Sequence, residues 1–213
     1  MAELSLEIWS DILCPWCFIG SRHLATALDE TSHDVDVTWR AFQLDPTLDT
    51  EGISNRERLV VKFGGEANYE AAAEKVSESG SRVGIDFDHA AVQAANTLRA
   101  HQLIAAAADE GLADEVVPRL FSAQFEEGRN VSDLPTLEAI AAESGLGDPE
   151  SSVRRVADDE LLDGALADIT EASRLGIHGI PTFVVDRRVG VSGAVPPDML
   201  KGLFDQAADG PSS

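Results

Sequence analysis

The sequence predicts an α/β fold in which two separate stretches of chain form a small sheet, with an all-helical segment between them. An alternating strand near the N-terminus leads into the only two cysteines, Cys14 and Cys17, which continue into a helix. A second strand pattern begins after Pro181, near the C-terminus. From about residue 54 to residue 175 the apolar residues repeat at helical spacing, with no convincing strand.

The first elements are a strand, a cysteine pair and a helix. Every second residue from 4 to 8 is apolar, which predicts a strand that ends near Ser10. Cys14-Pro15-Trp16-Cys17 follows, and apolar residues then recur at helical spacing over residues 19–28. A strand, a Cys-x-x-Cys pair and a helix in this order open a thioredoxin fold.

The cysteine spacing is suited to thiol–disulfide exchange. Cys14 is expected at the N-terminus of the helix, where unpaired N–H groups and the helix dipole favour a thiolate. Pro15 suits the first turn because its missing N–H has no helical partner there. Cys17 lies one turn further in, so we expect Cys14 to be the nucleophile and Cys17 to resolve the mixed disulfide. Pro15 and Trp16 are candidate substrate contacts.

Other interpretations of the cysteines are a zinc site, a structural disulfide and two unrelated buried thiols. A zinc site needs four ligands, and the five histidines are scattered with no His-x-x-x-His pair, so no metal is expected. A disulfide across so small a loop would constrain little of the unfolded chain.

The second signal is Gly-Ile-Pro-Thr-Phe at residues 179–183, a turn that runs into a strand. Arg187 and Arg188 form a short turn before a further strand at 189–192, so a hairpin is expected. Alone, Pro181 is a weak signal because most X-Pro bonds are trans. With the cysteine pair, the chain resembles the thioredoxin superfamily. That resemblance implies that the Ile180–Pro181 bond is cis, and that Ile180 and Pro181 position an extended substrate segment beside the sulfurs.

A closer resemblance is to DsbA-like oxidoreductases, in the frenolicin-biosynthesis-type branch. It is carried by the Ser-Asp-Ile-Leu-Cys-Pro-Trp-Cys-Phe-Ile-Gly opening at 10–20 and by the second-strand segment at 39–46. It covers nearly the whole chain, with softer matches at 96–103, 120–125 and 192–196. The periplasmic members have an export signal and a His within the cysteine motif, and this chain has neither.

The resemblance implies a thioredoxin-like domain from residues 1–50 and 175–213, with a helical insertion at 51–174 that lies over the cysteine pair and forms its own small core. Within the insertion the spacing predicts helices over 66–83, 90–110, around 117–125, over 133–145 and over 154–174. A last helix is expected over 198–208.

The function implied is that of a thiol–disulfide oxidoreductase, which oxidises, reduces or isomerises disulfides of a protein or small-molecule substrate. The redox-active pair takes the place of a bound cofactor, with glutathione or another small thiol as a possible co-substrate. No third cysteine exists for an internal relay, so electrons must pass to or from another protein or a small thiol.

Two alternatives stay open. One is a glutathione-dependent isomerase or transferase, like the hydroxychromene-carboxylate isomerases and kappa-class transferases, which typically have serine at the first cysteine position. The other is a non-catalytic redox-sensing or peptide-binding module.

Two polar residues have both a structural and a functional interpretation. His101, on a helix of the insertion, is either a proton-handling or substrate contact near Cys14 or an ordinary surface or half-buried helix residue, and we favour the ordinary interpretation. Asp11 either influences cysteine ionisation or caps the turn before the helix, and no role is assigned to it.

Composition narrows the partners. With 38 acidic and 16 basic residues the net charge is −22, which argues against nucleic acid and anionic membranes as partners. Thirteen of the bases are arginine and three are lysine, a pattern typical of a halophilic protein or of a GC-rich genome. The first strand begins almost at the N-terminus, with no signal segment before it, so we expect a cytoplasmic protein.

Overall fold

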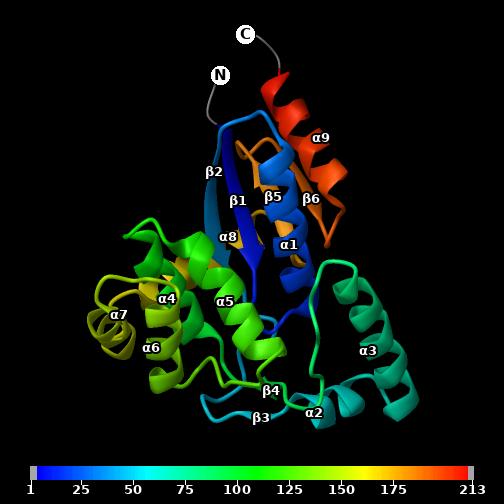
Figure 1. Ribbon diagram of the computed structural model, residues 1–213, viewed down its shortest axis with the longest axis vertical. Helices are drawn as coiled ribbons and strands as arrows, with labels where there is room; N and C mark the ends of the chain where they lie inside the picture. The colour runs from blue at the N-terminus through cyan, green and yellow to red at the C-terminus, as the bar shows by residue number, and fades with distance from the viewer. Residues whose placement is uncertain (1–3, 211–213) are drawn as a thin grey trace.

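A computed structural model of the chain describes residues 4–210, so the outermost residues of the expected domain, 1–3 and 211–213, lie outside it. Within the described residues, the main sheet has the strand order β2-β1-β5-β6. Strand β1 (Leu4–Ser10) is parallel to β2 (Val35–Ala41) and antiparallel to β5 (Thr182–Val185), which pairs with β6 (Val189–Ser192). The expected α/β thioredoxin-like fold is confirmed, and its sheet joins the two ends of the chain (Figure 1).

Helices cover both faces of this sheet. On one face α1 (Pro15–Glu30) and α9 (Pro197–Ala208) share a core with Leu6 and Ile8 of β1. Because successive strand residues point to opposite faces, Trp9 points the other way, and its indole N–H donates to the Asp168 carbonyl of α8 (Leu162–Arg174) at 3.3 Å. Helix α8 therefore packs on the sheet, although the expected boundary at residue 174 assigned it to the insertion.

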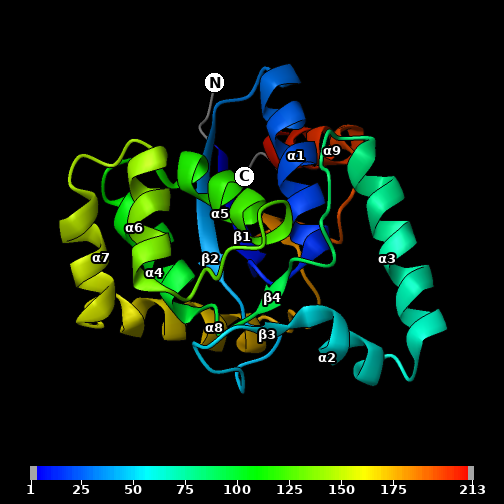
Figure 2. The same ribbon diagram turned by 60° about the horizontal axis from the view of Figure 1, so that its bottom comes forward.

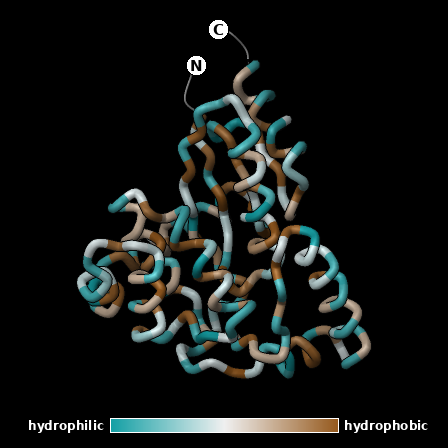
Figure 3. Tube along the Cα trace, viewed as in Figure 1, coloured by the Kyte–Doolittle hydropathy of each residue, from teal (hydrophilic) through white to brown (hydrophobic). Residues whose placement is uncertain are grey.

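The remaining helices form two groups on either side of the lower end of α1 (Figures 1 and 2). In the first group are α2 (Asn55–Lys62) and α3 (Glu66–Ser81). The second group consists of α4 (Leu98–Ala108), α5 (Ala113–Phe125), α6 (Leu134–Glu143) and α7 (Pro149–Ala157). Along the helices in Figure 3, hydrophobic and hydrophilic residues alternate, as expected where one face of a helix is buried.

Phe18 of α1 packs against the second group of helices. Its ring stacks on Phe121 of α5 at a centroid distance of 5.3 Å and lies edge-on to Phe87 at 6.0 Å. Cys14, Cys17 and Phe18 belong to the same buried apolar cluster as residues of α4, α5, α6 and α7 in the insertion. The insertion therefore shares its core with α1 and does not form the separate small core that was expected.

The helix predicted over 90–110 is wrong in its first turns, since α4 begins only at Leu98. Gln93 and Ala94 instead form β4, which pairs with β3 (Ile53–Ser54). The Asn96 side chain then ends the extended segment, because its Oδ1 accepts from the Leu98 N–H at 3.0 Å while its Nδ2 donates to the Leu48 carbonyl at 3.0 Å. Two-residue strands leave no alternating pattern, so the expectation of no strand in this region also needed correction.

Other local expectations are confirmed. The Asp133 carboxylate accepts from the Thr136 N–H at 3.1 Å and so caps α6, at the start of the helix expected over 133–145. Helix α3 and the β5–β6 hairpin also lie where they were expected. In the described part of the chain, no helix is both long and apolar enough to span a membrane.

Candidate active site

Cys14 is the N-cap residue of α1. Its backbone is extended, with φ −100° and ψ 110°, and its carbonyl accepts from the Cys17 and Phe18 N–H groups at 3.0 and 3.4 Å. Pro15 occupies the first turn, as expected. The first backbone N–H groups of the helix are therefore directed toward the end at which the Cys14 sulfur lies.

Asp11 holds the turn that precedes the helix. Its Oδ1 accepts from the Leu13 N–H at 3.2 Å and its Oδ2 from the Leu44 N–H at 2.7 Å, and its carbonyl accepts from the Cys14 N–H at 3.0 Å. The Asp11 side chain is buried, with 1% of its surface exposed. The turn-capping interpretation of Asp11 therefore accounts for its contacts.

The second sequence motif meets the first at the sulfur of Cys14. The Ile180–Pro181 peptide bond is cis, as predicted. The Cys14 Sγ lies 3.9 Å from the Ile180 carbonyl oxygen, so residues 166 positions apart in the chain are adjacent here. Both Cys14 and Cys17 are free thiols in this structure.

Cys17 lies beneath the surface, beside Cys14, and only 1% of it is exposed. Burial raises the pKa of the Cys17 thiol well above its ordinary value of 9.0, and the neighbouring Cys14 raises it further. The Asp11 backbone and the Ser10 hydroxyl, which would stabilise the thiolate, oppose that shift in the pKa of Cys17. The raised pKa therefore keeps the Cys17 thiol protonated at neutral pH.

A groove of about 530 Å³ opens over Cys14. Of the residues predicted from sequence, Cys14, Pro15, Trp16 and Ile180 line it, whereas Cys17 and Pro181 are buried and do not. The insertion supplies the other wall from α2 and α3, so it lies over the cysteine pair as expected. No motif marks these wall residues, which are Asn55, Arg58, Leu59, Lys62, Phe63, Tyr69, Ala72, Ala73, Lys75 and Val76.

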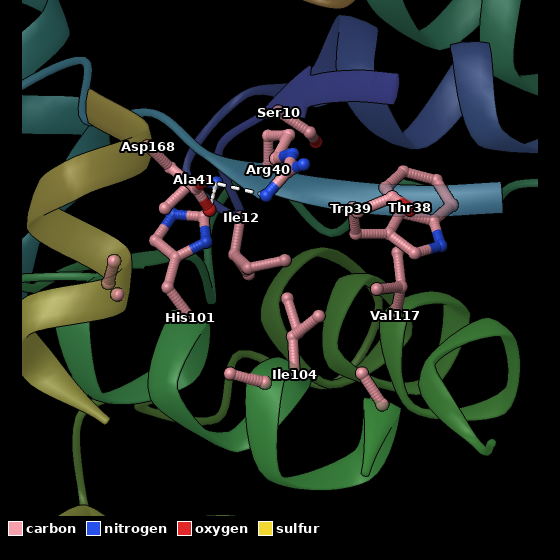
Figure 4. Close-up of a pocket in the computed structure, with 14 residues that line it drawn as sticks. Ser10, Ile12, Thr38, Trp39, Arg40, Ala41, His101, Ile104, Val117 and Asp168 are labelled. Carbon is pink, nitrogen blue, oxygen red and sulfur yellow. Dashed lines mark hydrogen bonds and ion pairs between the residues drawn. The ribbon is translucent and has the colours of Figure 1, made fainter. Parts of the chain in front are cut away.

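His101 belongs to a different cavity, of about 240 Å³, between the sheet and the insertion (Figure 4). It is 5% exposed, its Nε2 lies 3.0 Å from the Phe42 carbonyl, and the Asp11 carboxylate is 3.7 Å away. It is not among the residues that line the Cys14 groove. The described contacts thus tie α4 to the end of β2, and His101 is more buried than the surface or half-buried residue that was expected.

Arg40 and Asp168 face each other in this second cavity, with 3.1 Å between the guanidinium and the carboxylate (Figure 4). The Asp168 carboxylate also accepts from the Ala41 N–H at 3.2 Å. Burial nevertheless raises the pKa of Asp168, and the bonds from Ala41 and Arg40 only partly offset that. Ser10 lines the same cavity and also adjoins Cys17, and its buried hydroxyl oxygen has no hydrogen-bond partner among the described residues.

Comparison with known proteins assigns the chain to a family. The family described as DSBA-like thioredoxin domain matches residues 5–205 of the chain. The chain belongs to this family. A probable DsbA oxidoreductase from Streptomyces coelicolor is 30% identical to this DSBA-like chain and superposes with a TM-score of 0.90, covering 99% of this chain and 92% of that one.

Two further relatives of the DSBA-like chain extend the comparison. The uncharacterized protein YwbO of Bacillus subtilis (strain 168) is 26% identical in an alignment of 208 positions that covers 94% of this chain and 96% of YwbO. The cytosolic disulfide reductase DsbM from Pseudomonas aeruginosa, solved with GSH, is 23% identical with a TM-score of 0.66, and 96% of each chain is covered. The DsbM structure shares the fold with the DSBA-like chain.

Proposed function

We propose that this DSBA-like chain is a thiol–disulfide oxidoreductase in which Cys14 is the nucleophile and Cys17 the resolving residue. The observation that carries the proposal is the position of the Cys14 sulfur, at the N-terminus of α1 and 3.9 Å from the Ile180 carbonyl, in the wall of an open groove. Cys17 lies behind it, out of reach of a substrate in that groove.

The exchange needs two displacements. The Cys14 thiolate attacks one sulfur of the substrate disulfide, which forms a mixed disulfide and releases one substrate thiolate. Cys17 then loses its proton and attacks the Cys14 sulfur, which forms the Cys14–Cys17 disulfide and releases the second thiolate. The substrate gains two electrons and the cysteine pair loses two, and the reverse sequence oxidises a dithiol.

Backbone and ring contacts beside the sulfurs position the substrate. Ile180 presents its main chain to an extended segment, and Pro15 and Trp16 contact the part that leaves the groove. Pro181 fixes the Ile180 carbonyl against Cys14.

We assign the protein to the cytoplasm and to the frenolicin-biosynthesis-type branch, with glutathione or another small thiol as the co-substrate. The relative DsbM, described as cytosolic and solved with GSH, supports the compartment and the small thiol. The Cys-Pro-Trp-Cys-x-Ile-Gly opening supports the branch.

The test is a redox titration in glutathione buffers, with alkylation of Cys14 and Cys17 read by mass spectrometry. We expect a reversible two-electron transition. Cys14→Ser should abolish disulfide exchange, and Cys17→Ser should accumulate a mixed disulfide at Cys14. A cysteine pair that stays reduced across the whole range would overturn the proposal.

The same variants separate the alternatives. A glutathione-dependent isomerase uses a serine at the first cysteine position, so Cys14→Ser would retain its activity. A non-catalytic peptide-binding module would bind its ligand equally well with Cys14→Ser and show no turnover in either form.

A further inference from the structure

The groove over Cys14 gathers positive charge in a strongly acidic chain. The protein has 38 acidic residues, yet of the twenty described residues that line the groove none is Asp or Glu. Three are Arg or Lys, namely Arg58, Lys62 and Lys75, and the groove is also lined by His89, whose pKa is lowered by burial. The groove therefore differs in sign from the rest of the molecule.

Lys62 and Lys75 are the two positively charged residues of the groove that are free to pair with a ligand. Arg58 already pairs with Asp45 at 2.7 Å, and hydrogen bonding from Thr47 together with this contact lowers the pKa of Asp45 to about 2. Over residues 4–210, neither Lys62 nor Lys75 forms an ion pair. The third lysine of the chain, Lys201, instead pairs with Glu30 and Asp198.

Lys75 lies close to the redox motif itself. Its Nζ is 6.0 Å from the centroid of the Trp16 ring, and Trp16 separates Pro15 from Cys17 in the Cys-x-x-Cys motif. Lys62 ends α2 and lines the same groove. A ligand whose sulfur reaches Cys14 would thus share the groove with two ammonium groups, one from α2 and one from α3.

The rest of the groove wall is largely apolar. Leu59 and Phe63 face it from α2 and the residue after it, and Tyr69 and Val76 face it from α3. Its volume of about 530 Å³ is that of a small-molecule site. Charge and shape together define a compact ligand with an apolar body and negative groups at its edges.

We propose that the substrate of the Cys14 groove is an anionic disulfide or thiol of low molecular mass, with an apolar body and carboxylates that pair with Lys62 and Lys75. This inference rests on the proposed oxidoreductase function and adds the substrate class to it. The net charge of −22 would by itself repel an anion, so a preference for anions has to come from the groove.

The probes are two aromatic disulfides that differ in charge. The first, 5,5′-dithiobis(2-nitrobenzoate), has two carboxylates, and the second, 4,4′-dithiodipyridine, is neutral. Each oxidises the reduced protein: Cys14 displaces one aryl thiolate, Cys17 displaces the other, and the protein disulfide forms. The aryl thiol released is followed by its absorbance at constant ionic strength.

The variants are Lys62→Gln, Lys75→Gln and the double variant, with Lys201→Gln as the matched control because it also removes one lysine charge, on α9. We expect each groove variant to slow the dianionic probe by about two- to fivefold, and the double variant by about tenfold. The neutral probe should change by less than about twofold, and Lys201→Gln should change neither rate by more. For each probe, the rate of the variant is divided by the rate of the wild type. This ratio removes the difference in intrinsic reactivity between the two probes.

Several outcomes would overturn this substrate class. If the variants slow both probes equally, the lysines act on Cys14 and not on the ligand. If they slow neither probe, the lysines take no part in recognising the ligand. If the double variant slows only an acidic peptide disulfide, the groove binds protein substrates instead. Failure of the wild-type protein to release a second thiolate from either probe would count against the oxidoreductase function itself.

Discussion

Gly20 gives Pro181 the room to pack on the active-site helix. A Cβ built at residue 20 would come within 2.9 Å of the Pro181 Cγ and 3.5 Å of the Phe183 ring. Real Cβ atoms essentially never approach that closely, and the proline ring cannot swing aside as the end of a long side chain can. The absence of a side chain at Gly20 therefore helps to set the distance between the Ile180 carbonyl and Cys14.

Gly20→Ala should separate α1 from Pro181. Although Ala favours the helix, the overpacked contact should cost about 1–3 kcal/mol of unfolding free energy and slow disulfide exchange, because Ile180 moves away from Cys14. Urea denaturation and the exchange rate measure the two effects. Gly202→Ala is the control, since nothing lies within 4 Å of a Cβ placed at residue 202 in α9, and it should raise stability by up to about 1 kcal/mol. An unchanged exchange rate in Gly20→Ala would mean that the Pro181 contact does not position the site.

The step in which Cys17 resolves the mixed disulfide should accelerate with pH. Burial, more than the neighbouring Cys14, holds the pKa of Cys17 above 9.0, and burial persists when Cys14 is in the mixed disulfide. The thiolate fraction of Cys17 is therefore small at neutral pH and should rise about tenfold per pH unit until its pKa is reached. Stopped-flow release of the second thiolate, measured between pH 6 and pH 10, checks this. A plateau below pH 8 would contradict the buried-thiol assignment.

Ser10→Ala should slow the same step and leave the first displacement unchanged. The Ser10 hydroxyl adjoins Cys17 and has no hydrogen-bond partner among the described residues, so it is free to donate to the Cys17 thiolate, and its loss should raise the pKa of Cys17 further. Hydrogen bonds to charged groups contribute about 1.5–3 kcal/mol, which corresponds to a rate reduction of about tenfold or more. Ser21→Ala is the control, because the Ser21 hydroxyl donates to the Phe18 carbonyl at 2.7 Å within the same helix. Equal effects of the two variants would assign Ser10 to packing alone.

The sequence was informative where the cause was local. Cys14 and Pro15 lie at the start of α1 and the β5–β6 hairpin forms as predicted. Each of these features depends mainly on residues that are neighbours in the sequence. The cis bond before Pro181 followed from the resemblance to a known fold and not from the residues around it.

The groove and the second cavity depend on contacts between distant residues. Asn96 ends the β4 segment by bonding to Leu48, which lies 48 residues earlier. Lys75 reaches Trp16 only because α3 packs across the start of α1. His101 is buried because α4 meets the end of β2, and no periodicity in α4 itself signals that contact. Contacts of this kind, between residues far apart in the chain, leave no pattern in a single sequence from which they could be predicted.

Glu7 joins three segments of the sheet, and this gives the last prediction. Its carboxylate is 5% exposed and accepts from the Arg40 guanidinium of β2 at 2.6 Å and from the Arg187 guanidinium of the hairpin turn at 2.8 Å. Burial opposes ionisation of Glu7, but the bonds from Arg187 and Arg40 outweigh it, so its pKa lies below 4.5. The stability from this lowered pKa is fully present above pH 4.5, and it is lost as the pH falls through the folded-state pKa.

Glu7→Gln should therefore lower the free energy of unfolding at pH 7 by about 3 kcal/mol, because it leaves Arg40 partly buried without its closest partner. The variant should also lose less stability than the wild type between pH 5 and pH 3, because it lacks the carboxylate that titrates there. Urea denaturation at each pH measures both effects. Glu138→Gln on the exposed face of α6 is the control and should change the unfolding free energy by less than about 0.5 kcal/mol. Parallel pH profiles for Glu7→Gln and wild type would mean that the acid-sensitive stability comes from other carboxylates.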